Sequence, residues 1–189
     1  MKDAIKKHLE ESLIAKEDLL KNQLSVIEEI AQVMTEAVNK GKKIIIFGNG
    51  GSAADAQHMA AELVGRYKKE RKPIAAIALS TNTSNITAIA NDYGFENIFL
   101  KQLQALGQEG DIALGISTSG NSPNVIKALR WANENGLITF GLSSKDGGEL
   151  KTCTNCCLSI NSNNTPIVQE AHISCIHILC DIIESHLNV

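Results

Sequence analysis

The sequence lacks any unbroken apolar run near the roughly 18 residues that a membrane span requires. It also lacks an excess of charge of one sign, since 18 Lys and Arg against 21 Asp and Glu leave a formal net charge of −3. Without a strong positive field, nucleic acid is not expected as a direct ligand. The 189 residues are of a length that favours one compact domain, so we expect a single domain over 1–189.

Two further absences concern the cellular compartment. The segment Met1 to Ser12 is charged and helix-forming, without the apolar core and cleavage site of a secretory signal. The five cysteines are an odd number, which argues against a secreted disulfide framework. We therefore expect a cytoplasmic protein with reduced thiols.

The cysteines also lack the partners that would make a metal site. Cys153, Cys156 and Cys157 have no second C-x-x-C motif or nearby histidine pair to close a zinc site. We expect these three to be incidental thiols in and before a strand, and Cys175 and Cys180 to be packing residues on the last helix.

What the sequence does contain is an alternation of helical and strand patterns. Apolar residues recur at threes and fours from Leu9 to Val38, which predicts a long amphipathic helix, or two joined ones, as an N-terminal helical arm over 1–40. Five short apolar strands follow, at 44–47, 74–79, 111–116, 137–142 and about 157–160, and a last helix covers about 166–187. Uniformly apolar strands separated by helices predict an α/β fold with a parallel sheet covered on both faces.

The loops after these strands are polar, and in open parallel sheets ligands bind beyond the carboxyl ends of the strands. The first loop, Gly48 to Ala53, matches the dinucleotide pattern G-x-G-x-x-A. Dinucleotide binding also needs an acidic residue at the end of the second strand, where the sequence has Leu79, Ser80 and Thr81. Dinucleotide binding is therefore disfavoured, and no Walker A motif is present.

A second loop, Ser117 to Ser122, favours binding of a phosphate. Four of its six residues carry hydroxyl groups, and Pro123 after it is typical of a first helical turn. Backbone N–H groups and the helix dipole at such a terminus bind anions without Lys or Arg. The alternative is an ordinary cap and turn, which Ser and Asn also favour.

Two histidines lie on helical patterns. His58 and Glu62 are four residues apart, so they share a helix face and could share a metal ion or a proton, or form a simple surface pair. His177 lies on a helix that is apolar nearly all round, and taken alone this pattern favours a core histidine over a site group at an interface.

Four segments carry a family resemblance: FGNGGSAADAQHMAAEL, IANDYGF, GISTSGNSPNVIKAL and QEAHISCIHIL. Together they resemble the sugar isomerase (SIS) domain, specifically the phosphoheptose isomerase family, from about residue 40 to the end. The resemblance implies a three-layer, flavodoxin-like α/β sandwich with a five-stranded parallel sheet, and a homotetramer with sites at subunit interfaces. The implied activity interconverts sedoheptulose 7-phosphate and D-glycero-D-manno-heptose 7-phosphate for bacterial lipopolysaccharide core or other surface glycans.

The resemblance also implies roles for individual residues. The expected acid/base pair is Glu62 and His177, and the expected zinc ligands, for one ion per subunit, are His58, Glu62, Gln169 and His177. The expected substrate-binding residues are Asn49, Gly50, Gly51, Ser52, Glu62, Asn91, Asp92, Ser117, Thr118, Ser119, Ser122 and Gln169. Of these, the residues from Ser117 to Ser122 would hold the phosphate.

Two of the four expected zinc ligands are widely separated along the last helix. Gln169 and His177 are eight residues apart, or about 12 Å along a regular helix, which is far for two side chains on one ion. Either Gln169 precedes the regular helix, or the ligands come from two chains.

The main alternative is a non-catalytic SIS-fold adaptor that binds the replication initiator. Such an adaptor needs no acid/base pair, so Glu62 and His177 together favour the enzyme.

Overall fold

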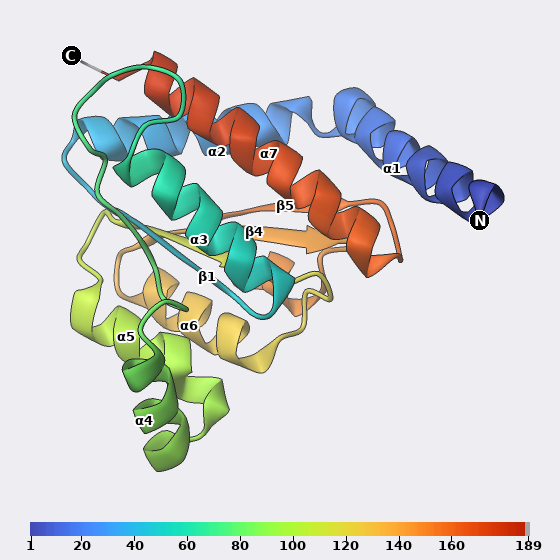
Figure 1. Cartoon of the computed structure of the whole chain (residues 1–189). Coiled ribbons are helices and arrows are strands. Elements are labelled where there is room, and N and C mark those ends of the chain that lie inside the picture. Colours follow the sequence, from blue (N-terminus) through green and yellow to red (C-terminus); the bar gives the residue numbers. More distant parts are fainter. Residues whose placement is uncertain (188–189) are drawn as a thin grey trace.

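The computed structural model describes residues 1–187 and contains a five-stranded parallel sheet (Figure 1). The strands run in the order β2-β1-β3-β4-β5. They are β1 Ile44–Gly48, β2 Ala76–Ala78, β3 Ile112–Ile116, β4 Ile138–Ser144 and β5 Cys156–Ile160. The central strands β1 and β3 are buried along their whole length, because helices cover both faces of the sheet. The predicted α/β class is confirmed.

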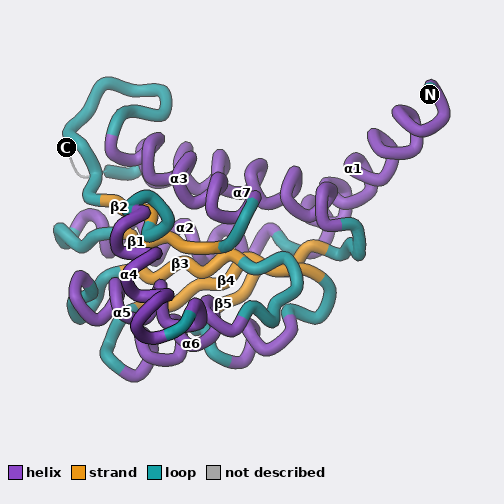
Figure 2. Tube along the Cα trace, turned by 60° about the horizontal axis from the view of Figure 1, so that its bottom comes forward, coloured by secondary structure: helices purple, strands orange, loops and turns teal. Residues whose placement is uncertain are grey.

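The helices form the two outer layers of the sandwich (Figure 2). They are α1 Lys2–Asn22, α2 Leu24–Asn39, α3 Gly51–Val64, α4 Thr83–Tyr93, α5 Ile98–Leu106, α6 Pro123–Glu134 and α7 Thr165–Ser185, with 3-10 turns η1 Phe95–Asn97 and η2 Gly148–Thr152. One apolar core joins the sheet to α2, α3 and α7, and a second joins it to α5 and α6. The sheet thus separates two cores, and α3 and α7 lie side by side on one face.

The helix α7 is long and apolar enough to span a membrane by length and composition alone. Half of that segment is buried inside the fold, against α2, α3 and α1. Its apolar character is therefore explained by core packing, with Cys175, Ile176 and Leu179 at most 1% exposed.

One strand prediction needs correction, at the edge of the sheet. The strand predicted over 74–79 is ordered as a strand only over Ala76–Ala78, because it is an edge strand paired on one side. The loop after β2 is short, since Asn82 caps α4 and the helix begins at Thr83. The N-terminal arm is two joined helices that meet at Gln23, which is one of the two forms predicted for 1–40.

The five cysteines are all free, as predicted. Cys156 and Cys157 lie in β5 and Cys153 just before it. Cys175 and Cys180 are buried in α7, where burial raises the pKa of each thiol to about 12. Thiols in this environment remain protonated near neutral pH and act as packing groups.

Candidate active site

The helices α3 and α7 bring together three side chains that are distant in the sequence. One nitrogen or oxygen atom from each of His58, Glu62 and His177 lies within 4.8 Å of the other two. The two Nε2 atoms of His58 and His177 are 2.9 Å apart, and His58 Nε2 lies 3.3 Å from Glu62 Oε1. The helical spacing of His58 and Glu62 sets one side of this cluster, and the packing of α7 on α3 sets the other.

The helix pattern taken alone favoured a core position for His177, and this prediction was wrong, because the side chain is only half-buried and contacts His58. The buried histidine of α7 is His172, which is 0% exposed and whose Nε2 lies 2.9 Å from the Ser143 carbonyl oxygen. Sequence reasoning also missed Tyr67, whose ring centroid lies 5.9 Å from that of His177. No local pattern singles out Tyr67, since it follows α3 in an irregular loop.

The cluster suits a divalent metal ion of the zinc type. Imidazole nitrogens and carboxylate oxygens are zinc ligands, and tetrahedral ligands about 2.1 Å from one ion lie about 3.4 Å apart. The separations of 2.9 Å between the two Nε2 atoms and 3.3 Å between His58 Nε2 and Glu62 Oε1 are close to that spacing. Gln169 lies inside the regular helix α7, so the possibility that it precedes the helix is wrong.

Gln169 instead lies against the start of α3. A Cβ atom at Gly51 would lie 2.3 Å from Gln169 Nε2 and 2.8 Å from its Oε1. Only glycine at this position leaves room for the amide in its present place. The loop between β1 and α3 and the first half of α7 therefore meet at this amide.

The first loop is also tied to the start of α6. Asn49 Nδ2 donates to Asn124 Oδ1 at 2.9 Å, and Asn124 Nδ2 donates back to Asn49 Oδ1 at 2.8 Å. Sequence reasoning missed Asn124, which is 2% exposed. Gly50 adopts φ of +57°, a left-handed conformation that favours glycine, and Ser52 after it is buried.

The second loop forms a compact hydroxyl cluster between β3 and α6. Ser117 Oγ lies 2.9 Å from Ser122 Oγ and 3.4 Å from Ser119 Oγ. Ser144 Oγ donates to the Thr118 carbonyl oxygen at 2.6 Å, which ties this loop to the end of β4. Ser122 occupies the N-cap position of α6 without a side-chain capping hydrogen bond, and Pro123 is the first residue of the helix, as the sequence predicted for this proline. Because β1 and β3 are neighbours, this loop and the Asn49 loop leave the same sheet edge.

Asn91 and Asp92 are placed differently. Both are exposed on α4, which has no buried residue, and Asn91 Nδ2 donates to Asp92 Oδ1 at 2.8 Å. Within residues 1–187, no hydrogen bond joins either side chain to the His58, Glu62 and His177 cluster.

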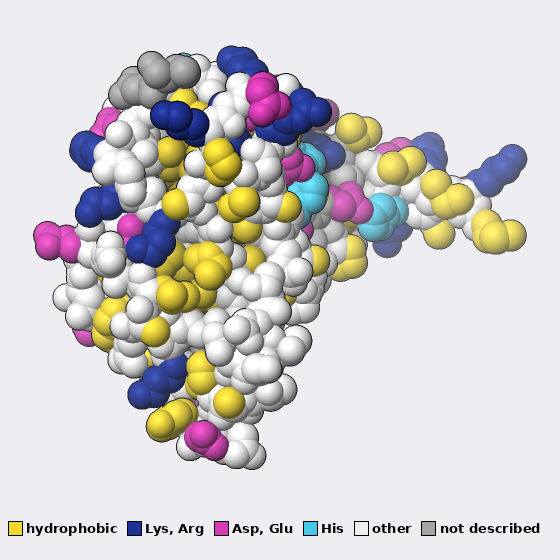
Figure 3. Space-filling model, turned by 60° about the vertical axis from the view of Figure 1, so that its left-hand side comes forward, with side chains coloured by type: hydrophobic (Ala, Val, Ile, Leu, Met, Phe, Trp, Pro, Cys, Tyr) yellow, Lys and Arg dark blue, Asp and Glu magenta, His cyan; other side chains and the backbone are white. Residues whose placement is uncertain are grey.

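The cluster is open in a single chain. The His58 side chain is 43% exposed and that of Glu62 is 25% exposed. Figure 3 shows histidine side chains on the surface near the place where the N-terminal arm leaves the body. Hydrophobic side chains are visible along the arm in the same view.

This chain is similar to known proteins over nearly its whole length. The SIS domain family matches residues 8–144. The phosphoheptose isomerase of Trichlorobacter lovleyi is 52% identical over 187 residues, which cover 99% of this chain and 95% of that protein.

Two solved structures of phosphoheptose isomerases are similar over nearly the whole chain. The protein from Neisseria gonorrhoeae superposes with a TM-score of 0.91 at 41% identity, covering 97% of this chain and 98% of that one. The protein from Francisella tularensis gives a TM-score of 0.93 at 37% identity, covering 97% of both chains. From the family match, the identity and the shared fold together, this chain belongs to the phosphoheptose isomerase family of SIS-domain proteins.

Proposed function

We propose that this chain is an aldose-ketose isomerase that converts sedoheptulose 7-phosphate to D-glycero-D-manno-heptose 7-phosphate. The observation that carries the proposal is the meeting of Glu62 and His177, from two helices distant in the sequence, within 4.8 Å. Membership in the phosphoheptose isomerase family supports the substrate. The test is to incubate the purified protein with sedoheptulose 7-phosphate and to follow formation of the aldose. Absence of the aldose would refute the proposal.

The reaction moves a carbonyl between C1 and C2 through an enediol, which requires proton transfer at carbon and at oxygen. In the ketose-to-aldose direction, Glu62 takes a proton from C1 while His177 donates one to the C2 oxygen. The enediol then loses its C1 hydroxyl proton to His177 and receives the proton from Glu62 at C2. A carboxylate and an imidazole can exchange these protons in either direction.

His58, Glu62 and His177 would hold one zinc ion per subunit, with Gln169 as the fourth family ligand. When bound, zinc supplies Lewis-acid polarisation of the sugar oxygens. Gln169 is two helical turns before His177 on α7, so its participation requires either a shift of its amide or ligands from a second chain.

The hydroxyl cluster of Ser117, Thr118, Ser119 and Ser122 would hold the phosphate. Hydroxyl and backbone N–H donors at the N-terminus of α6 supply the required polarity. Asn49, Gly50, Gly51 and Ser52 would contact the sugar from the neighbouring strand end, with Asn91, Asp92 and Gln169. The Asn49 and Asn124 amide pair supports a fixed separation between the sugar loop and the phosphate loop.

The contact between Gly51 and Gln169 gives a testable prediction. Gly51→Ala should fold with a free energy of unfolding within about 1 kcal/mol of wild type, because alanine is a good helix former and the clash is with a flexible amide. The displaced amide should lower kcat/KM for sedoheptulose 7-phosphate by about tenfold or more. Steady-state kinetics and thermal unfolding test this, with the exposed Ala54→Gly on the same helix as a control for helix stability. Unchanged kinetics in Gly51→Ala would show that the amide position is unimportant.

We also propose self-association as a homotetramer. The helix α1 exposes a row of apolar side chains, each 57% or more exposed: Ile5, Leu9, Leu13, Ile14 and Leu20. Soluble proteins rarely leave such a row uncovered, and a second copy would also enclose the open His58 and Glu62.

The arm therefore gives a second prediction. Leu9→Glu combined with Leu13→Glu should shift the mass measured by sedimentation or light scattering from tetramer toward smaller species, because a buried interface would acquire unpaired charges. Lys7→Glu, at an exposed position two residues before Leu9 and so roughly on the opposite side of the same helix, is the control. A wild-type protein that sediments as a monomer would contradict the proposal.

The cytoplasm is the proposed compartment, since the substrate is a sugar phosphate and the five thiols are free. The adaptor alternative finds no support among the relatives described above, which are named as isomerases.

A further inference from the structure

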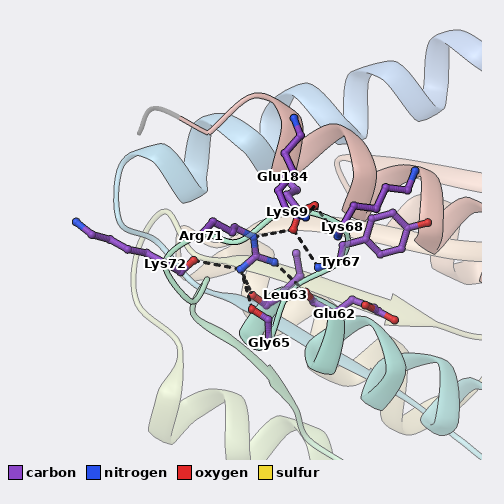
Figure 4. A network of polar contacts seen from close by, with 9 residues as sticks. All are labelled: Glu62, Leu63, Gly65, Tyr67, Lys68, Lys69, Arg71, Lys72 and Glu184. Atoms are coloured by element: carbon purple, nitrogen blue, oxygen red, sulfur yellow. Dashed lines mark hydrogen bonds and ion pairs between the residues drawn. The ribbon is translucent and has the colours of Figure 1, made fainter.

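A buried ion pair joins the loop after α3 to the end of α7 (Figure 4). Arg71 Nε donates to Glu184 Oε1 at 3.1 Å, and the two side chains are 6% and 1% exposed. Both residues lie outside the cluster of His58, Glu62 and His177, and neither is assigned a part in the proposed reaction.

The carboxylate of Glu184 organises the loop itself. It accepts hydrogen bonds from the backbone N–H groups of Tyr67, Lys68 and Lys69 at 2.9, 2.7 and 2.8 Å. Burial alone would raise the pKa of Glu184, but these N–H groups and Arg71 outweigh it and hold the pKa below its usual range. Glu184 is therefore charged near neutral pH, and three consecutive residues of the loop are fixed to α7.

The guanidinium of Arg71 completes the link to α3. Nη2 donates to the Glu62 carbonyl oxygen at 2.8 Å, and Nη1 donates to those of Leu63 and Gly65 at 2.8 and 3.3 Å. Carbonyl groups in the last turn of a helix have no partner within the helix, so a cation is favourable there. One planar group thus binds α3 on one side and α7 on the other.

Arg71 and Glu184 are each connected to one member of the acid/base pair. Arg71 binds the backbone of Glu62 itself. Glu184 lies seven residues, or two helical turns, after His177 and so on the same face of α7. Tyr67, whose N–H is held by Glu184, places its ring beside His177.

A buried ion pair is a weak source of stability, because desolvation of the two charges offsets their attraction. Apolar side chains could hold the two helices together as well, but they would not fix the orientation of α3 relative to α7. The directional hydrogen bonds of the Arg71 guanidinium do fix this orientation. Such precision matters, because a misplacement of about 1 Å at reacting groups can lower the rate about a hundredfold. On the basis of the proposed function, we infer that Arg71 and Glu184 are positioning residues that set Glu62 against His177.

The test compares Arg71→Lys and Glu184→Gln with a matched control. Arg71→Lys keeps the charge and loses the fork, while Glu184→Gln keeps the shape and loses the charge. The control is Asp181→Asn, which removes the exposed ion pair Lys68–Asp181 between the same loop and the same helix. In folded protein, verified by circular dichroism, kcat should fall about 10- to 100-fold in the two variants. The KM for sedoheptulose 7-phosphate should stay within about threefold, and the control should match wild type.

A second measurement separates this inference from the proposed function. The imidazole NMR signals of His58 and His177 should shift in Arg71→Lys and Glu184→Gln but not in Asp181→Asn. An inactive wild type would refute the proposed function, whereas the histidine signals would still test the link. If Glu184→Gln does not fold, Arg71→Lys alone decides the matter. Folded variants with wild-type kcat or unshifted imidazole signals would overturn the inference.

Discussion

Replacing Glu62 by glutamine is expected to lower kcat for the isomerisation about 10²- to 10⁴-fold, because the amide keeps the shape of the carboxylate but cannot take a proton from carbon. His177→Ala should lower kcat over a similar range. The two side chains lie within 4.8 Å of each other, so they are expected to act on the same substrate. The measurement is the initial rate of aldose formation from saturating sedoheptulose 7-phosphate.

Two controls sharpen this result. His186→Ala removes an exposed histidine just after the same helix and should leave kcat unchanged. The double variant Glu62→Gln with His177→Ala should be about as slow as the slower single variant, because residues that act as a unit are not additive. Wild-type turnover in either single variant would remove that residue from the acid/base pair.

Acid should destabilise the wild type more than a variant without His172. The Ser143 carbonyl only accepts, so Nε2 of His172 carries the hydrogen and the buried Nδ1 has no partner. Burial lowers the pKa of His172 from 6.5 to about 4, partly opposed by the Ser143 carbonyl. Between pH 6.5 and 4, His172 therefore binds a proton in the unfolded chain but not in the folded chain. Stability from this group is present above pH 6.5 and falls by about 3 kcal/mol as the pH drops to 4.

Urea unfolding at pH 7 and pH 4.5 measures this effect as a difference between proteins. Burial also raises the pKa of Asp55 to about 6, which acts in the opposite direction over the same range, so the wild-type curve alone is not diagnostic. His172→Gln keeps a donor for Ser143 but cannot be protonated, and its stability should depend less on acid. His186→Gln, at an exposed histidine, should follow the wild type. Equal acid sensitivity in wild type and His172→Gln would contradict the assignment.

The sequence by itself determined the features that depend on local chemistry. Runs such as Ile44 to Phe47 predicted buried strands, and the Pro123 that follows a serine-rich loop predicted the start of α6. The four-residue spacing of His58 and Glu62 put them on one helix face, which any regular helix ensures. The single domain over 1–189 stays a prediction.

Only the tertiary structure decided which distant groups meet. The periodicity of α7 could not separate His177 from His172, because both lie on a largely apolar helix. In the folded chain His177 contacts His58 of α3, whereas His172 is buried with its ring against the Ser143 carbonyl of β4. The same holds for Asn124, Tyr67, Arg71 and Glu184, whose partners lie in other elements. The pattern of apolar and polar residues within one helix or strand follows from its regular period, about 3.6 residues in a helix and two in a strand. Contacts across elements depend on how helices pack on a shared sheet, which has no signature within a short stretch of sequence.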